Sequence, residues 1–325
     1  MLERESELQA ITAQLDRACA GDGSLTVVEG PAGIGKTTLL RAAASLAGER
    51  GMRVLRARGG ILEQDLEYGL VRQFVERPVL QAPPERRAAL LAGPAAPAAA
   101  VLGLAPLPSD GGPGHDPAAD ILHALQWVVA NLADDGPLLL VLDDAHWGDG
   151  ASLRAGGYLA RRLEGLPVAL LVGTRNDEPG SQQRLLAELF GAADAHYLRP
   201  QPLSGDGVAR MLGAAFGGGV PSPALVAACD HATGGNPFLL VELAAELANA
   251  HETPDAVPVE TVAQAGPLAV RRSLLLRLGH LGEPALLLAR AIATLGGEGE
   301  LRHAAAIAGL PLGVAGGAAD ALTAA

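Results

Sequence analysis

Residues 30–37 carry glycines, a lysine and a threonine at a spacing that suits the binding of phosphate groups. They read Gly-Pro-Ala-Gly-Ile-Gly-Lys-Thr, which fits the pattern G-x-x-x-x-G-K-[ST]. Glycines let successive backbone N–H groups turn toward phosphate oxygens, and the start of the following helix adds a partial positive charge. We expect Lys36 to reach the β- and γ-phosphates and the Thr37 hydroxyl to hold Mg²⁺. Nucleotide contacts are expected from Gly30, Pro31, Ala32, Gly33, Ile34, Gly35, Lys36, Thr37 and Thr38.

The segments that flank this loop have the order that a phosphate-binding loop requires, which is a strand before it and a helix after it. Residues 25–28, Leu-Thr-Val-Val, form a short β-rich apolar run. Residues 37–47 are rich in helix formers, with leucines available for one face. The alternative is a glycine-rich turn that matches by accident, and this context argues against it. The pattern is that of the P-loop NTPases.

Two adjacent carboxylates follow another apolar run. Residues 138–142 read Leu-Leu-Leu-Val-Leu and are followed by Asp143 and Asp144. A continuous apolar run of this length is typical of a parallel strand that is buried on both faces. At the carboxyl edge of the sheet, both acids would face the phosphate-binding loop. We expect Asp143 to hold Mg²⁺ through water and Asp144 to polarise the attacking water; the alternative for either is that it caps the next turn.

A threonine and an arginine come at the end of the next apolar run, residues 168–172. Thr174 and Arg175 follow it closely and are expected to sense the γ-phosphate. The alternative for Arg175 is an ordinary surface cation. No chemical role is assigned to His146 or Trp147, because a lone histidine is more often structural than catalytic.

Strands alternate with helices over residues 1–203, which predicts a doubly wound parallel α/β domain. The expected helix 68–77 is predicted to end at Pro78. Residues 81–118, rich in proline and alanine, are expected to form an irregular insertion in which only 85–91 suits a short helix. The expected strands are 25–28, 53–57, 138–142, 168–172 and 196–198. The expected helices are 5–20, 37–47, 68–77, 118–133, 151–163 and 182–190.

Strand signals fade from residue 204 onward. Residues 204–255 are expected to form a helical lid and residues 256–325 a further helical module. The expected helices are 204–216, 223–231, 238–249, 267–278, 284–295, 301–308 and 314–324.

Three segments together resemble the ATPase region of large LuxR-type transcriptional regulators, which belong to the STAND class of AAA-like P-loop ATPases. They are residues 29–38, residues 143–153 (Asp-Asp-Ala-His-Trp-Gly-Asp-Gly-Ala-Ser-Leu) and residues 234–238 (Gly-Gly-Asn-Pro-Phe). The resemblance implies a P-loop NTPase domain, a helical lid and a partial winged-helix-like module over 256–325. It also implies ATP or ADP with Mg²⁺ as cofactors, and contact of Pro237 with the nucleotide.

The sequence departs from that family in two places. Relatives open with an apolar-Gly-Arg-Glu element near the adenine, whereas this chain has Leu-Glu-Arg-Glu at residues 2–5. Arg4 is expected to keep its role, but the glycine is missing. Relatives also continue into a complete winged helix, a helical sensor array and a DNA-binding domain. Because this sequence ends at Ala325, we expect a fragment, truncated product or stand-alone remnant that does not bind DNA directly. Nucleotide-dependent self-association and an unknown small-molecule or protein inducer are the partners that the resemblance implies.

Composition limits the remaining classes. The net charge is −12, from 24 basic and 36 acidic residues, and an acidic chain without a visible basic stripe is a poor nucleic-acid binder. The charged N-terminus does not suit a signal peptide, and no apolar run reaches about 18 residues. We therefore expect a cytoplasmic protein that does not bind membranes.

Three functions follow as hypotheses. The first is a nucleotide switch with low Mg²⁺-dependent ATPase turnover. The second is a scaffold that keeps nucleotide without hydrolysing it. The third is a small-molecule phosphotransferase, which is disfavoured because Arg210 is the one arginine or lysine in the lid segment 204–250.

Overall fold

The computed structural model describes residues 1–106, 117–175, 181–191, 195–264, 281–295 and 300–324. The described residues form two compact units, the first almost entirely within residues 3–200 and the second within residues 201–325.

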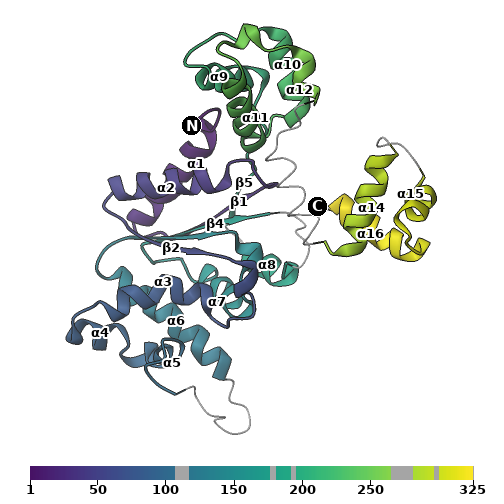
Figure 1. The fold of residues 1–325 in the computed structure, drawn as a ribbon. Coiled ribbons are helices and arrows are strands. Elements are labelled where there is room, and N and C mark those ends of the chain that lie inside the picture. Colours follow the sequence, from purple (N-terminus) through teal and green to yellow (C-terminus); the bar gives the residue numbers. More distant parts are fainter. Residues whose placement is uncertain (107–116, 176–180, 192–194, 265–280, 296–299, 325) are drawn as a thin grey trace. The chain divides into compact units, whose positions relative to one another are not determined.

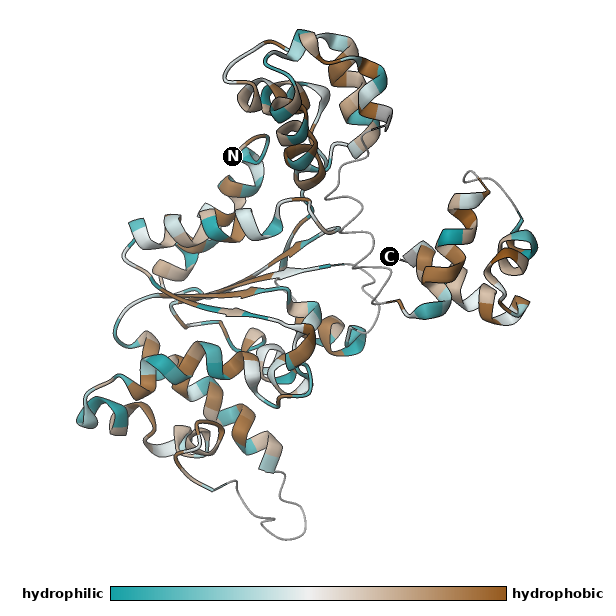
Figure 2. Cartoon of the chain, viewed as in Figure 1, coloured by the Kyte–Doolittle hydropathy of each residue, from teal (hydrophilic) through white to brown (hydrophobic). Residues whose placement is uncertain are grey.

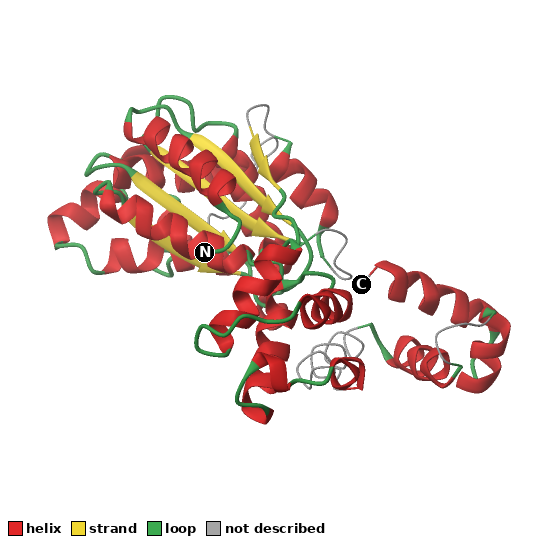
Figure 3. Cartoon of the chain, turned by 90° about the horizontal axis from the view of Figure 1, so that it is seen from above, coloured by secondary structure: helices red, strands yellow, loops and turns green. Residues whose placement is uncertain are grey.

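The first unit is built on one five-stranded parallel sheet with the strand order β2-β3-β4-β1-β5. All strands run in the same direction, so their carboxyl ends meet at one edge (Figures 1 and 3). The register places Glu29 of β1 opposite Thr174 of β4, and Arg58 of β2 opposite Asp143 of β3. The strands are β1 Ser24–Glu29, β2 Arg53–Arg58, β3 Leu138–Asp143, β4 Val168–Thr174 and β5 Ala195–Leu198.

Helices cover both faces of this sheet, which is why the central strands read as continuous apolar runs (Figure 2). On β3, Leu138, Leu140 and Leu142 pack into one hydrophobic cluster, while Leu139 and Val141 pack into the other. One layer contains α1 Glu5–Cys19 and α2 Lys36–Glu49. The other contains α3 Gly69–Leu80, α6 Pro117–Ala133, α7 Gly150–Ala160 and α8 Gln183–Phe190. The predicted doubly wound α/β fold is confirmed.

The expected short helix at 85–91 is confirmed, but the prediction of otherwise irregular structure over 81–118 is wrong for the part that the structure describes. Residues 84–101 contain the helices α4 Pro84–Leu90 and α5 Ala98–Val101, with the 3₁₀ turn η2 Gly93–Ala95 between them. Leu90, Ala98 and Val101 are buried in the same cluster as α6. Proline favours the first turn of a helix, where no N–H partner is lost. Here prolines begin helical segments instead of preventing them. Residues 107–116 lie outside the described part.

The prediction that Pro78 ends the preceding helix is also wrong. Helix α3 continues to Leu80 with Pro78 inside it and buried. Proline in a helix removes one backbone hydrogen bond. Here Pro78 lies in the last turn of α3. The burial of Pro78 and Val79 stabilises this turn and offsets the lost hydrogen bond.

The second unit is helical in its described residues. Leu212, Leu225, Leu240 and Leu243 lie in one hydrophobic cluster, formed by α9 to α12. The last three helices share a second cluster, which is largely alanine. Helix α12 was not predicted, the predicted helix 267–278 lies outside the described residues, and the division into a lid and a winged-helix-like module stays a prediction. The helices are α9 Gly205–Ala215, α10 Pro223–Thr233, α11 Pro237–Ala250, α12 Val259–Gln264, α14 Glu283–Thr294, α15 Leu301–Ala308 and α16 Leu312–Ala324.

Among the described helices, none is long and apolar enough by itself to cross a membrane. The pair Leu301–Ala308 and Leu312–Thr323, bent by 107°, meets the length and composition criterion when taken together.

Asp149 joins the starts of two helices beside the carboxyl edge of the sheet. Its Oδ1 accepts hydrogen bonds from the N–H groups of Ser152 (2.8 Å) and Tyr68 (2.9 Å), and its Oδ2 accepts from the N–H of Leu70 (3.2 Å). The Ser152 hydroxyl accepts from the N–H of Val71 at 3.1 Å. These side chains satisfy N–H groups that have no partner within α3 and α7. Asp149 and Ser152 of the 143–153 motif therefore have a structural role.

We predict that Asp149→Ala lowers the free energy of unfolding by about 2–4 kcal/mol, because it removes a helix cap and leaves buried N–H groups unpaired. Urea unfolding followed by circular dichroism measures the change. Asp149→Asn keeps one acceptor oxygen and should lose less than half as much stability. Equal losses in the two variants would contradict the capping role.

Candidate nucleotide-binding site

The glycine-rich loop joins β1 to α2, as the sequence predicts. Gly33 and Gly35 have φ angles of 80° and 103°, a region that side-chain-bearing residues rarely adopt. The N–H of Gly30 donates to the Thr174 carbonyl at 3.4 Å, which ties the start of the loop to the end of β4. These conformations form the backbone concavity that phosphate binding requires.

Lys36, the only lysine in the sequence, lies inside the loop. Its Nζ donates to the carbonyls of Gly30 at 2.7 Å and Pro31 at 2.8 Å, and its side chain is buried. A buried ammonium group needs compensating acceptors. Because phosphate oxygens are stronger acceptors than loop carbonyls, this arrangement fits a nucleotide phosphate.

Thr37 and Asp143 connect the loop to the third strand. The Thr37 hydroxyl donates to Asp143 Oδ2 at 2.9 Å, and Asp143 Oδ1 accepts from the N–H of Asp144 at 3.0 Å. Gly173 lets β4 pass close by, since a Cβ there would lie 3.2 Å from Asp143 Oδ1 and 2.8 Å from Leu40 Cδ1. A hydroxyl beside a carboxylate is a donor set that Mg²⁺ prefers, so these residues fit the predicted metal.

Asp144 lies beside the loop, but its carboxylate already has a cationic partner. Arg58 donates to Asp144 Oδ2 from Nε (3.1 Å) and Nη2 (2.9 Å), and this hydrogen bond raises the pKa of Arg58. Asp144 itself has a left-handed backbone with φ 51°, which is uncommon outside glycine and typical of functional sites. Sequence reasoning missed Arg58, and the signal that identifies it is the parallel register that places it opposite Asp143.

His146 is fully buried, and neither of its ring nitrogens has a hydrogen-bond partner in the described structure. Its Nε2 lies 3.8 Å from Asp144 Oδ1. Burial, followed by the charge of Arg175 and a smaller effect of Lys36, lowers the pKa of His146 to about 3, although Asp144 acts in the opposite direction. The imidazole is therefore neutral near pH 7.

Arg175 and Thr174 come at the carboxyl end of β4. Thr174 is buried, and its hydroxyl lies 3.4 Å from the Arg175 carbonyl oxygen. The charge of Arg175 contributes to the lowering of the pKa of His146. Arg175 directly follows β4 at the carboxyl edge of the sheet, and its role as a γ-phosphate sensor stays a prediction.

The remaining predicted contacts are divided between the two units. Arg4 is buried, and its Nη2 donates to the carbonyl of Ile34 in the loop at 3.3 Å. Thr38 lies in the first turn of α2, and its side chain is exposed. Pro237 belongs to the second unit, where Asn236 caps α11 through the N–H groups of Phe238 and Leu239, so its contact with nucleotide stays a prediction.

We predict that His146→Phe reduces the pH dependence of stability. Below about pH 6.5 the unfolded chain binds a proton that the folded chain, with its His146 pKa of about 3, does not bind. The wild-type free energy of unfolding therefore falls as the pH drops from about 6.5 toward 3, by up to about 1.4 kcal/mol per pH unit from this group. Urea unfolding at pH 7, 6 and 5 should show a smaller slope for the variant. Identical slopes would contradict the buried neutral imidazole.

Comparisons with known proteins agree with the fold described above. The fold is similar to the ORC1 protein of Aeropyrum pernix, solved in complex with DNA, at 17% identity over 99% of this chain and 83% of that chain, with a TM-score of 0.54. It is also similar to a Walker-type ATPase of Pyrococcus abyssi, at 17% identity over 90% of this chain and 80% of that chain, with a TM-score of 0.54. No curated protein sequence is significantly similar. A sequence model described as AAA ATPase domain matches residues 1–172, more than half of the chain, which therefore belongs to the AAA ATPase domain family.

Proposed function

We propose that this chain is an ATP-binding regulatory switch that hydrolyses its nucleotide slowly. The observation that carries the proposal is the 2.9 Å hydrogen bond between the Thr37 hydroxyl and Asp143, which brings the two predicted metal ligands together beside the Lys36 loop. A P-loop and an acid at the end of a neighbouring strand are the parts that phosphoryl transfer shares across P-loop NTPases.

In this proposal the loop N–H groups and Lys36 bind the phosphates, and Lys36 exchanges its two loop carbonyls for phosphate oxygens. Thr37 and Asp143 hold Mg²⁺, which supplies charge neutralisation at the phosphates. Asp144 orients and polarises water. Arg175 and Thr174 detect the γ-phosphate, and Arg4 supports the loop from the Ile34 carbonyl.

We assign the switch to a LuxR-type regulator of the STAND class on the strength of the 143–153 and 234–238 segments. In the second unit Gly235 has φ 67°, and a Cβ there would lie 2.5 Å from the Leu203 carbonyl oxygen, so this turn requires glycine. In this proposal, Pro237 contacts the nucleotide, and the fixed turn before α11 transmits the nucleotide state to the helices of the second unit. Nucleotide-dependent self-association and an inducer of unknown chemistry belong to this proposal.

The Arg58–Asp144 ion pair favours slow turnover and also supports a second candidate, a scaffold that keeps its nucleotide unhydrolysed. An oxygen that accepts two hydrogen bonds from Arg58 is less available to an attacking water. The switch requires the Arg58–Asp144 ion pair to open during turnover, whereas the scaffold keeps it closed.

Turnover of variants tests the proposal. Wild type should release phosphate slowly from ATP, and Asp144→Asn should lower that rate at least tenfold, about 1.4 kcal/mol of barrier, without weakening ATP binding. Arg58→Gln should raise the rate at least threefold, because it frees the Asp144 carboxylate. Phosphate release is measured with a fluorescent phosphate sensor at saturating ATP and Mg²⁺.

Arg184→Gln is the matched control, since Arg184 is an exposed arginine whose ion pair with Glu188 involves neither acid of the site. Its rate should equal that of wild type. ATP binding without phosphate release in wild type and Arg58→Gln would favour the scaffold. Absence of ATP binding in the wild-type chain would overturn both candidates.

A further inference from the structure

Strand β2 is the outermost strand on one side of the sheet, so one of its edges faces away from the other strands. The N–H of Arg53 donates to the Pro137 carbonyl and the N–H of Gly59 donates to the Asp143 carbonyl, both at 2.9 Å. Bonds from a parallel strand alternate between its two sides. The N–H and C=O groups of Val54, Arg56 and Arg58 therefore face the open edge.

Gln73 occupies one position of this edge as a neighbouring strand would. Its Oε1 accepts from the N–H of Arg58 at 2.8 Å, and its Nε2 donates to the carbonyl of Arg58 at 3.2 Å. Among the described residues, no comparable side-chain partner is present for the outward backbone groups of Val54 and Arg56. An open strand edge of this kind is a template for an added strand.

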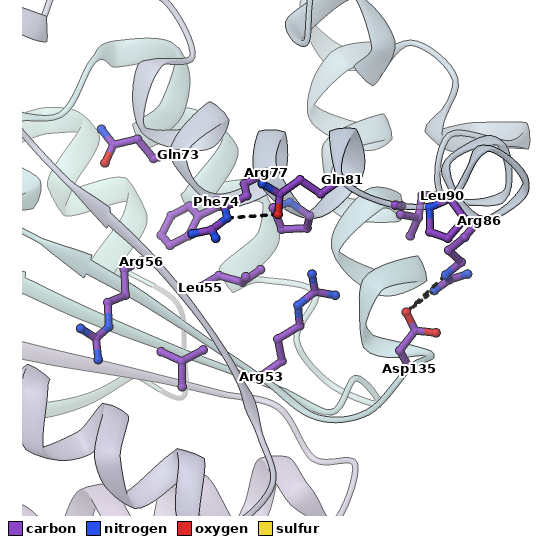
Figure 4. A pocket seen from close by; sticks show the side chains of 14 residues that line it. Arg53, Leu55, Arg56, Gln73, Phe74, Arg77, Gln81, Arg86, Leu90 and Asp135 are labelled. Carbon is purple, nitrogen blue, oxygen red and sulfur yellow. Dashed lines mark hydrogen bonds and ion pairs between the residues drawn. The ribbon is translucent and has the colours of Figure 1, made fainter.

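A groove of about 620 Å³ runs along the open edge between β2 and the helices α3 and α4. Arg53, Arg56, Arg77 and Arg86 line it, and Figure 4 shows these arginines around the groove with Leu55 and Phe74 between them. Asp135 is the one acid in the lining, and it pairs with Arg86 at 2.9 Å. The linear sequence does not indicate this cluster, because the fold brings the two arginines of β2 together with Arg77 and Arg86.

Three of the four arginines in the groove form no ion pair with a described acidic residue, so their charges are available to an anionic ligand. Arg53 and Arg56 are exposed, and the structure shows no ion pair for either with another described residue. Arg77 donates only to the neutral Gln81 side chain, at 3.2 Å. In a chain of net charge −12, such a cluster attracts carboxylates and repels like-charged basic ligands.

We propose that the open edge of β2 binds an extended acidic segment of a partner protein as an additional parallel or antiparallel strand. Its backbone pairs with Val54 and Arg56, its apolar side chains contact Leu55 and Phe74, and its carboxylates bind the arginines bidentately. A polynucleotide could meet the arginines but would leave the backbone groups of the edge unpaired, so the peptide uses more of the observed features. This groove adjoins the proposed ATP site, since Arg56 and Gln73 also line the pocket that contains Thr37 and Asp143, but strand addition at β2 does not depend on hydrolysis.

The test is fluorescence anisotropy of the full chain with a labelled peptide in which glutamate alternates with valine. Arg53→Glu should weaken binding at least tenfold, and a peptide with proline in place of each valine should bind at least tenfold more weakly, because proline lacks the N–H. A lysine–valine peptide should not bind. Arg184→Glu changes the net charge equally at an exposed position of α8 and should bind like wild type. Circular dichroism confirms that each variant is folded.

Equal loss of binding in Arg53→Glu and Arg184→Glu would overturn the site, because net charge alone would then explain the affinity. Equal binding of the valine and proline peptides would overturn strand addition. A labelled single-stranded DNA that binds more tightly than the acidic peptide, and loses that binding in Arg53→Glu, would replace the peptide by a nucleic acid. Unchanged ATP turnover in Arg53→Glu is expected in every case, so failure of this proposal is distinguishable from failure of the ATPase proposal.

Discussion

The hydrogen bond between Thr37 and Asp143 connects the glycine-rich loop to the acidic end of β3. The strand order of the sheet brings these two residues within reach of each other. Thr37 lies in the first turn of α2 and Asp143 at the end of β3. They meet because β1 and β3 are parallel and separated by a single strand, β4. Gly173 on that strand leaves room for Asp143. Apolar packing on both faces of the sheet thus fixes a polar contact at its edge.

Compensation of buried charge explains the other contacts of the site. Lys36 uses loop carbonyls, Asp144 uses Arg58, and His146 remains neutral because burial disfavours its charged form. Lys36 and Asp144 therefore each have partners within the protein that phosphate oxygens or a metal can replace. Exchangeable partners of this kind suit a site whose state is to be changed by a ligand.

Local patterns predicted more of this molecule than long-range relations did. The loop at 30–37 and the buried run before Asp143 are recognisable because their chemistry lies in consecutive residues. The pairing of Arg58 with Asp144 was not predicted, since it depends on strand order and register. Helix α5 and the 3₁₀ turn before it were missed because proline was taken as a breaker, although at the start of a helix it is favourable. The basic groove at β2 is likewise visible only after folding.

The most direct test of nucleotide binding uses the fact that Lys36 is the only lysine of the chain. Lys36 and the N-terminal amine are the two amines that an amine-acylating reagent can modify, and mass spectrometry of the proteolytic peptides separates the two modifications. The account predicts that saturating ATP with Mg²⁺ slows acylation of Lys36 at least tenfold while the N-terminal amine reacts at an unchanged rate. An unchanged rate at Lys36 would contradict the assignment of this loop as the nucleotide site.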